Sequence, residues 1–374
     1  MTNGPRETPL AKKLKAQILS EGPISVAGFM SACLTDPDHG YYRRMPAIGA
    51  GGDFVTAPEI SQVFGELIGL WCVVVWQQMG KPSHLNLVEL GPGRGTLMRD
   101  ALRAARVVPG FLEAVQVHLV DKNETLRGVQ REVLSATGVP IHFHSEPSEA
   151  LMTRSAVPEG ATIVLANEFL DALPIEQFEF ADGGWRNRDV GIADNGEDFC
   201  FTPDLTTAYA PRTLPQNLVP KAGDIYEVSV HHHVLAKTGL QKRAEFGPLA
   251  ALFIDYGHAE TGFGDTLQGV AGQAHVSPFH APGETDLSAQ VDFQNFATQC
   301  RDAGFAVDGP VPQAGFLGRL GIVERASRLM SANPDKAGAI EIGVQRLMAP
   351  VGMGSRFLAL GVRSRALPPL PGFE

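Results

Sequence analysis

A glycine-rich turn that follows directly on an apolar strand places the strongest constraint on the fold of this chain. The stretch LVELGPGRGTL, residues 87–97, starts as an apolar strand and runs into a helix, with Gly91, Gly93 and Gly95 between them. A strand, glycine turn and helix in this order are typical of open α/β sheets, where the turn holds a nucleotide-like ligand. The turn therefore predicts both a fold class and a binding site.

Strand and helix patterns alternate along most of the chain. We expect strands at 86–90, 116–120, 140–143, 161–166, 251–257, 305–311 and 356–362, and helices at 8–21, 58–79, 95–106, 123–136, 226–244, 292–303 and 316–331. This alternation predicts a parallel sheet flanked by helices.

Two stretches break the alternation. From residue 174 the chain resembles short strands joined by tight turns, and Asn195-Gly196 is a strong hairpin signal because both positions tolerate positive φ. We expect an antiparallel excursion there. Residues 258–291 show no clear period, and an irregular stretch of that length is usually functional or mobile.

The residues around the glycine turn discriminate between ligands. A dinucleotide fingerprint is GxGxxG, whereas this turn is GxGxG, and it lacks the Lys of a triphosphate-binding loop. Glu89 would repel a pyrophosphate but suits a ligand with a positive amino group, such as S-adenosylmethionine. Asp121 follows the strand at 116–120, where an acid can accept both ribose hydroxyls; that acid would equally suit NAD, and a plain strand-to-helix turn is the structural alternative.

A further polar cluster follows the strand at 161–166. Ligands of open parallel sheets sit beyond the carboxyl ends of the strands. Asn167, Glu168 and Asp171, in NEFLDALP, are therefore expected beside the methyl group of the donor. The alternative for Glu168 and Asp171 is that they are acids that complement a helix N-terminus.

The amino-acid composition argues against several classes of protein. The 374 residues are 44% hydrophobic and carry a net charge of -10, which is typical of a globular protein and argues against sequence-blind binding to nucleic acid. The four cysteines form no CxxC pair, and the consecutive histidines 231–233 cannot easily converge on one ion, so we expect no metal site. We find no apolar run of about 18 residues and no targeting peptide, and expect a cytoplasmic protein without integral membrane association.

Four motifs together resemble the MidA-type family of S-adenosylmethionine-dependent methyltransferases, which includes the mitochondrial arginine methyltransferase that assists assembly of respiratory complex I. The motifs are GDFVTAPEISQVFGELIGLW, VELGPGRGTLMRD, ANEFLDALPIEQF and DLSAQVDF. The resemblance runs from about residue 22 to about residue 360. It implies a class I methyltransferase fold: a Rossmann-like, mostly parallel seven-stranded sheet with an N-terminal helical segment and an inserted antiparallel, loop-rich substrate region. One departure is Asp121, where the family often has Glu.

The resemblance also implies a function. The leading hypothesis is methylation of an arginine side chain of a protein, with a complex I subunit as the candidate partner. The alternatives are methylation of a small molecule or another nucleophile, or a cofactor-binding assembly protein without catalysis. For a eukaryotic source the alternative location is the mitochondrial matrix.

The predicted site residues fall into two groups. S-adenosyl-L-methionine is expected to contact Glu89, Gly91, Gly93, Gly95, Asp121 and Asn167. The acceptor is expected to contact Glu168 as the main guanidinium ligand, with Asp171 secondary and His280 and Asp286 contributed by a lid.

The predicted domain boundaries follow from the same motifs. We expect an N-terminal helical segment with a cofactor-covering loop at 1–82 and the methyltransferase domain at 83–374, with insertions at about 175–225 and 258–291. The stretches 52–61 and 258–291 are expected to close over the cofactor and exclude water, as methyl transfer requires.

Overall fold

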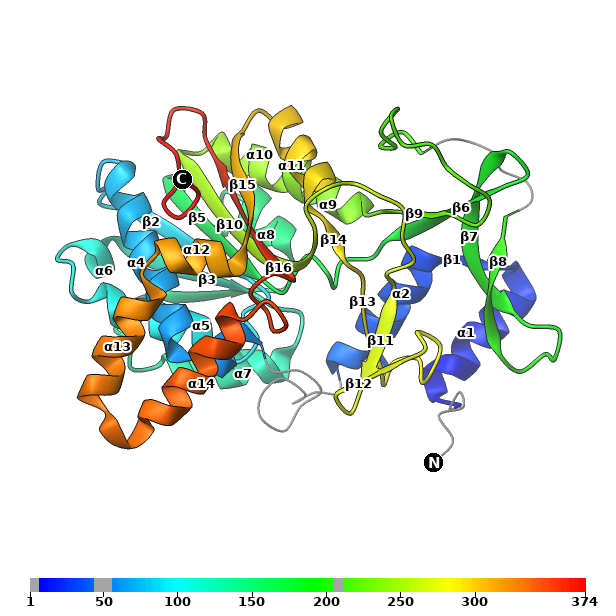
Figure 1. Ribbon diagram of the computed structural model, residues 1–374, viewed down its shortest axis with the longest axis horizontal. Coiled ribbons are helices and arrows are strands. Elements are labelled where there is room, and N and C mark those ends of the chain that lie inside the picture. Colours follow the sequence, from blue (N-terminus) through cyan, green and yellow to red (C-terminus); the bar gives the residue numbers. More distant parts are fainter. Residues whose placement is uncertain (1–6, 44–55, 205–210) are drawn as a thin grey trace. The chain divides into compact units, whose positions relative to one another are not determined.

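The computed structural model of this protein describes residues 7–43, 56–204 and 211–374 (Figure 1). They belong to two compact units, each with its own β-sheet structure and core. Met1–Ala47, Asp171–His232 and Glu260–Gln290 form the first unit, and Ile48–Leu170, His233–Ala259 and Val291–Glu374 form the second. The predicted N-terminal segment 1–82 contributes helices to both units. The beginning of the predicted covering loop at 52–61 lies outside the described residues.

A mixed sheet of eight strands forms the centre of the second unit. Its strands are β2 (Leu85–Leu90), β3 (Val115–Val120), β4 (Ile141–His144), β5 (Ala161–Asn167), β10 (Leu249–His258), β14 (Val291–Asp292), β15 (Ala306–Pro312) and β16 (Phe357–Arg363). The order is β15-β16-β10-β5-β2-β3-β4, and β14 pairs with the end of β10. Strands β2 to β5 and β10 pair in parallel, whereas β16 is antiparallel to both of its neighbours. The prediction of a mostly parallel α/β sheet is confirmed, with every predicted strand boundary within two residues.

The strand predictions succeed because the central strands are buried on both faces. Every residue of β2 is buried, and so is all of β5 except its last residue. Such strands are continuous apolar runs, and the flanking helices supply the cover. The eighth strand, which the resemblance did not imply, is the two-residue β14.

Helices surround this sheet. They are α3 (Ala57–Ile60), α4 (Gln62–Gln78), α5 (Thr96–Ala105), α6 (Phe111–Ala114), α7 (Glu124–Leu134), α8 (Pro147–Met152), the π-helix η2 (Leu235–Leu240), α10 (Gln241–Ala244), α11 (Phe293–Asp302), α12 (Gln313–Arg319), α13 (Ile322–Ala332), the 3₁₀-helix η3 (Pro334–Lys336) and α14 (Ala337–Met348).

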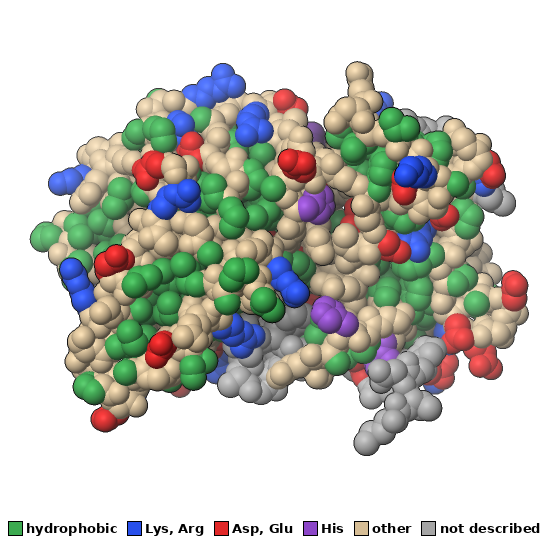
Figure 2. Space-filling model, viewed as in Figure 1, with side chains coloured by type: hydrophobic (Ala, Val, Ile, Leu, Met, Phe, Trp, Pro, Cys, Tyr) green, Lys and Arg blue, Asp and Glu red, His purple; other side chains and the backbone are tan. Residues whose placement is uncertain are grey.

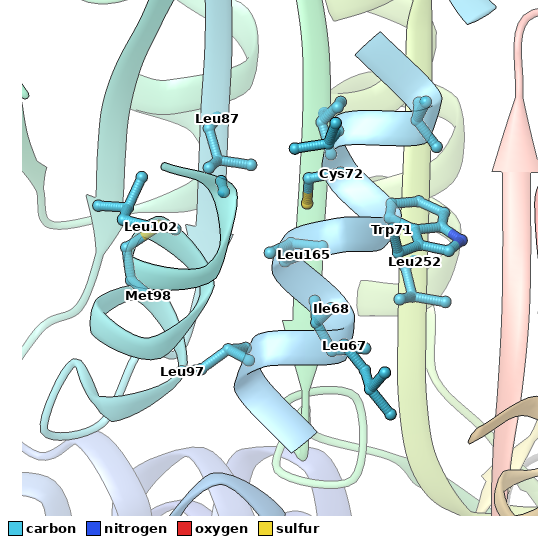
Figure 3. Close-up of a cluster of buried hydrophobic side chains, with 14 of the residues drawn as sticks. Leu67, Ile68, Trp71, Cys72, Leu87, Leu97, Met98, Leu102, Leu165 and Leu252 are labelled. Carbon is cyan, nitrogen blue, oxygen red and sulfur yellow. The ribbon is translucent and has the colours of Figure 1, made fainter. Parts of the chain in front are cut away.

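Helix α4 packs against the sheet beside α5 (Figure 3). The cluster joins three elements: Leu67, Ile68, Trp71 and Cys72 of α4, Leu97, Met98 and Leu102 of α5, and Leu87, Leu165 and Leu252 of the sheet. The two helices touch at Gly69, where an added Cβ would lie 2.3 Å from the carbonyl oxygen of Ala101. This close approach fixes α5, and with it the glycine turn at its start, against the sheet.

The first unit contains two antiparallel sheets. Its elements are α1 (Pro9–Glu21), β1 (Ile24–Ser25), α2 (Val26–Thr35), the 3₁₀-helix η1 (Tyr41–Arg43), β6 (Glu176–Ala181), β7 (Gly184–Ile192), β8 (Phe199–Pro203), β9 (Ile225–Val228), β11 (Gln268–Ala271), β12 (Ala274–Val276) and β13 (Asp286–Ser288), and α9 (Val230–Val234) spans the boundary between the units. One sheet has the order β1-β7-β6-β9 with β8 added on β7, and the other is β12-β11-β13. The predicted antiparallel excursion is therefore confirmed.

Residues that tolerate positive φ account for the two hairpins that join β6, β7 and β8. Asp182 and Gly183 join β6 to β7 with φ of 51° and 78°. Between β7 and β8, Gly196 has φ 71°, and the side-chain oxygen of Asn195 accepts hydrogen bonds from the amides of residues 197 and 198 at 3.0 and 3.1 Å. These are the positive-φ positions that Asn, Asp and Gly tolerate.

Three predicted helices differ from the structure: two are interrupted, and one begins as a strand. The predicted helix 58–79 is broken at Ser61, whose extended backbone separates α3 from α4, and the predicted helix 316–331 is broken at Gly321, which has φ 85°. The predicted helix 226–244 begins instead as β9, because this segment pairs with β6. Tertiary pairing overrides helix propensity there.

Other segments are more ordered than their pattern suggested. The stretch 258–291, expected to be irregular, contributes three strands of three or four residues, which are too short to show a period in the sequence. Helices α2 and α14 were not predicted.

Charged side chains are interspersed on the face that Figure 2 shows. There, Lys and Arg lie among Asp and Glu over several elements. Within the described part of the chain, no helix is both long and apolar enough to cross a membrane. In the same residues, no three His, Cys, Asp or Glu side chains are grouped so that they could hold a metal ion.

Candidate active site

The glycine turn between β2 and α5 has the backbone that its sequence predicts. Gly91, Gly93 and Gly95 have φ of 67°, 52° and 82°, all in the left-handed region that side chains disfavour. The amide of Gly91 donates to the carbonyl oxygen of Val120 at 3.1 Å, and an added Cβ on Gly91 would lie 3.1 Å from the ring of Phe169. The three glycines therefore allow a turn that lies close to both neighbouring strands.

This turn forms one wall of a pocket in the second unit. The pocket is lined by Thr56, Pro58, Glu59, Glu89, Gly91, Pro92, Gly93, Arg94, Thr96, Leu97, Asn167 and Glu168. Five of the residues predicted to bind cofactor or acceptor are thus brought together: Glu89, Gly91, Gly93, Asn167 and Glu168. They come from the ends of β2 and β5, as expected for an open parallel sheet.

Two buried oxygen atoms at this pocket accept no hydrogen bond from any described residue. Glu89 is only 3% exposed, and no described residue donates a hydrogen bond to its Oε2. The Oδ1 of Asn167 likewise has no partner among the described residues. Burial, with a smaller effect from the charge of Asp121, raises the pKa of Glu89 to about 8. Because unsatisfied buried acceptors are costly, the pocket fits a ligand that brings N–H donors and positive charge.

Asp121 lies at the end of β3, next to β2. It does not line the pocket itself, but its charge acts on Glu89. Its Oδ1 accepts from the amide of Asn123 at 2.8 Å, and its Oδ2 accepts from Nε2 of Gln130 at 2.9 Å. Burial raises the pKa of Asp121 to about 6, while these two hydrogen bonds oppose that rise. Its carboxylate is therefore held in a defined orientation.

Glu168 has an unusual backbone at the edge of the pocket. Its φ is 53°, a left-handed conformation that costs energy for a residue with a side chain. Its Oε1 accepts from Nδ2 of Asn167 and from the amide of Ala57, both at 3.0 Å. Ala57 begins α3, and the preceding Thr56 provides no side-chain cap. Glu168 thus supplies the cap of α3, besides any role toward an acceptor.

Asp255, which we did not predict, holds this strained loop. It is 1% exposed, and its Oδ2 accepts from the amides of Phe169 and Leu170 at 3.0 and 2.8 Å. Strain at functional sites persists where surrounding contacts over-determine it. A carboxylate near the end of the apolar strand at 251–257 was the signal in the sequence that could have identified it.

Arg94 and Gln130 were also missed. Arg94 lines the pocket and forms no ion pair with any residue that the structure describes. Gln130 connects Asp121 to the glycine turn. In the sequence, Arg94 was marked only by its place beside the glycine turn, and Gln130 only by its place in the helix that follows Asp121.

The remaining predicted acceptor residues belong to the first unit. No helix follows β5, so the alternative that Glu168 and Asp171 are the N-terminal acids of a helix in this segment is wrong. The carbonyl of Asp171 instead accepts from the amide of Ala289 at 3.0 Å. His280 precedes β13, and Asp286 begins it. Contacts of Asp171, His280 and Asp286 with an acceptor stay a prediction.

Comparisons with known proteins identify the family of this chain. Residues 67–311 match a family model described as a putative S-adenosyl-L-methionine-dependent methyltransferase. The chain is 37% identical to the protein arginine methyltransferase NDUFAF7 of Danio rerio, over 96% of this chain and 87% of that protein, and 36% identical to the Homo sapiens protein, over 94% and 82%. It is also similar to a crystal structure from Burkholderia thailandensis with bound S-adenosyl-homocysteine, with 25% identity, a TM-score of 0.81 and coverage of 99% and 97%.

The names of these relatives state where in the cell those proteins are found. The proteins from Danio rerio and Homo sapiens are both named mitochondrial. The comparisons therefore do not support the cytoplasmic prediction, and they agree with the alternative stated for a eukaryotic source.

Proposed function

The chain belongs to the S-adenosyl-L-methionine-dependent methyltransferase family whose model it matches, and from this premise we propose that it methylates an arginine side chain of a protein. The curated relatives are named for that activity. The observation in this chain that supports it is Glu168: a carboxylate on a strained, braced loop that lines the same pocket as the glycine turn. We further propose a complex I subunit as the substrate and, for a eukaryotic source, the mitochondrial matrix as the location.

In the proposed function, three residues bind different parts of the methyl donor. When bound, S-adenosyl-L-methionine supplies an electrophilic methyl group on its sulfonium. Glu89 and Asn167, whose buried oxygen atoms have no donor among the described residues, would accept hydrogen bonds from its ammonium group, and Asp121 would accept from its ribose hydroxyls. The sheet would then be the seven-stranded class I methyltransferase sheet, with β16 as its antiparallel member and β14 as an addition.

The acceptor half needs carboxylates because arginine is protonated at any accessible pH and is a poor nucleophile in that state. Glu168 orients one guanidinium nitrogen toward the methyl group and helps to remove its proton. Asp171, His280 and Asp286 remain proposed acceptor residues, as predicted from the sequence. The domain division predicted from the sequence, 1–82 and 83–374, is part of this proposal.

Incubation of a cell lysate with labelled donor, with and without the purified protein, tests the substrate class. A labelled protein band whose hydrolysate contains methylarginine supports the proposal. Label in small molecules, or on another side chain, would replace it with a different acceptor. No label would favour a cofactor-binding assembly role.

The first prediction concerns Asp121. Asp121→Ala is expected to weaken binding of S-adenosyl-homocysteine by about 1.5 to 3 kcal/mol, since charge-assisted hydrogen bonds to the ribose are lost. Titration calorimetry measures this directly. Asp335→Ala, at an exposed position of η3, is the control and should bind normally. Unchanged affinity in Asp121→Ala would contradict the ribose assignment.

The second prediction is a pH dependence. Ionised Glu89 binds the ammonium group, but its pKa in the free protein is about 8, so below that pH binding must release a proton. Affinity for S-adenosyl-homocysteine should therefore rise between pH 6 and 8, by up to about tenfold per pH unit, and level off above. Calorimetry in buffers of different ionisation enthalpy measures the released proton. Glu89→Gln should remove the rise between pH 7 and 8, leaving the dependence set by Asp121, whose pKa is about 6. A flat wild-type profile over this range would disprove the role of Glu89.

A further inference from the structure

Gln130 links two parts of the donor site that lie far apart in the sequence. It is fully buried on α7, and its Nε2 donates to the carbonyl oxygen of Gly93 at 2.7 Å and to Oδ2 of Asp121 at 2.9 Å. A glutamine amide has two N–H groups, so both bonds can form at once. Both partners are oxygen acceptors, which fixes the amide with its nitrogen toward them.

The surroundings of Gln130 make this link rigid. The side chain of Asn123 caps α7 by accepting from the amides of Thr125 and Leu126, and the amide of Asn123 donates to Oδ1 of Asp121. Asp121 therefore receives one donor on each oxygen, and both donors come from α7 and its cap. An added Cβ at Gly95 would lie 3.6 Å from Cγ of Gln130, so the glutamine also packs against the turn.

A glutamine is the side chain that can make this link without disturbing the charges nearby. Lysine or arginine would bring a positive charge that competes with an ammonium ligand for the carboxylates. Leucine would leave a carbonyl and a carboxylate without their donors. The hydrogen bond from Gln130 also favours the ionised form of Asp121, against the effect of burial.

We infer that Gln130 is a positioning residue of the donor site, which holds the glycine turn and the Asp121 carboxylate in one fixed geometry for the adenosine part of the ligand. The inference rests on the proposed contact of Asp121 with the ribose. It assigns to Gln130 no contact with the ligand itself.

The test uses the full-length protein and two ligands, S-adenosyl-homocysteine and methylthioadenosine, which has the adenosine part but lacks the amino acid. Gln130→Leu is expected to weaken both by a similar factor, about tenfold or more, because the disturbed group is the ribose acid. With methylthioadenosine, which lacks the amino group that Glu89 would bind, the pH at which binding becomes optimal should also rise, because Asp121 loses a donor that favours ionisation.

Gln313→Leu is the matched control. Gln313 is also a fully buried glutamine of the second unit that donates to a backbone carbonyl, that of Leu347 at 3.0 Å, but it does not line the pocket. A general loss of stability would affect both variants alike, whereas loss of ligand affinity is expected only in Gln130→Leu.

Gln130→Glu keeps the inference testable if the leucine variant does not fold. A carboxyl group donates only when protonated, and an ionised carboxylate beside Asp121 would repel it, so this variant should bind both ligands more weakly than the wild-type protein at neutral pH. Wild-type affinity and pH profile in folded Gln130→Leu or in Gln130→Glu would overturn the inference. If Asp121→Ala also binds normally, the proposed ribose contact fails; if Asp121→Ala is weakened, only the role of Gln130 fails.

Discussion

Glu168→Gln is expected to lower the rate of methyl transfer by about 100-fold or more, in the range of lost general-base catalysis, while affinity for S-adenosyl-homocysteine changes only a few-fold. The substitution keeps the size of the side chain and one acceptor oxygen, so the hydrogen bonds from Ala57 and Asn167 to Oε1 can persist. It removes the charge that would grip a guanidinium group. The rate is measured with labelled donor on a lysate that the wild-type protein labels.

Glu168→Ala separates catalysis from the structural role of the same carboxylate. This variant also removes the cap of α3, which should cost about 1 kcal/mol of stability in addition to the loss of transfer. A normal transfer rate in Glu168→Gln would show that Glu168 only supports α3. Loss of cofactor binding in that variant would instead assign Glu168 to the donor site, and the acceptor residues would have to be sought elsewhere.

Gly93→Val is expected to weaken binding of S-adenosyl-homocysteine by at least about 100-fold. Its φ of 52° is unfavourable for a β-branched residue, and strain of this kind costs about 1 to 3 kcal/mol. The side chain would also occupy pocket space, because Gly93 lines the pocket. Distortion of the turn would further disturb the bond between the Gly93 carbonyl and Gln130. Calorimetry measures the affinity.

Gly138→Val is the control for backbone strain alone. Gly138 belongs to the same unit and has φ 78°, but an added Cβ there meets no atom within 4 Å among the described residues. Thermal unfolding should show similar destabilisation in the two variants, whereas only Gly93→Val should lose the ligand. Ligand binding at wild-type strength in a folded Gly93→Val variant would remove the glycine turn from the donor site.

The sequence by itself determined the features that depend on short stretches of chain. The central strands could be located because burial on both faces makes each of them a continuous apolar run. The glycine turn could be located because three nearby residues need positive φ, and Glu89 because the end of β2 is where an open sheet binds its ligand. Helix ends were less predictable, as the breaks at Ser61 and Gly321 show, because a single residue with non-helical backbone ends a helix without changing the apolar period.

Only the tertiary structure decided how the site residues are held. Gln130 binds the carbonyl of a residue 37 positions away, Asp255 binds an amide 85 positions away, and the carboxylate of Glu168 caps a helix 111 positions away. No local pattern records such pairs, since each partner looks like an ordinary polar residue of its own segment. The same reason explains the helix predicted at 226–244, which begins as a strand because β6 lies beside it. Local patterns carry information about burial and backbone conformation, whereas the partner of a buried polar group exists only once distant segments have packed together.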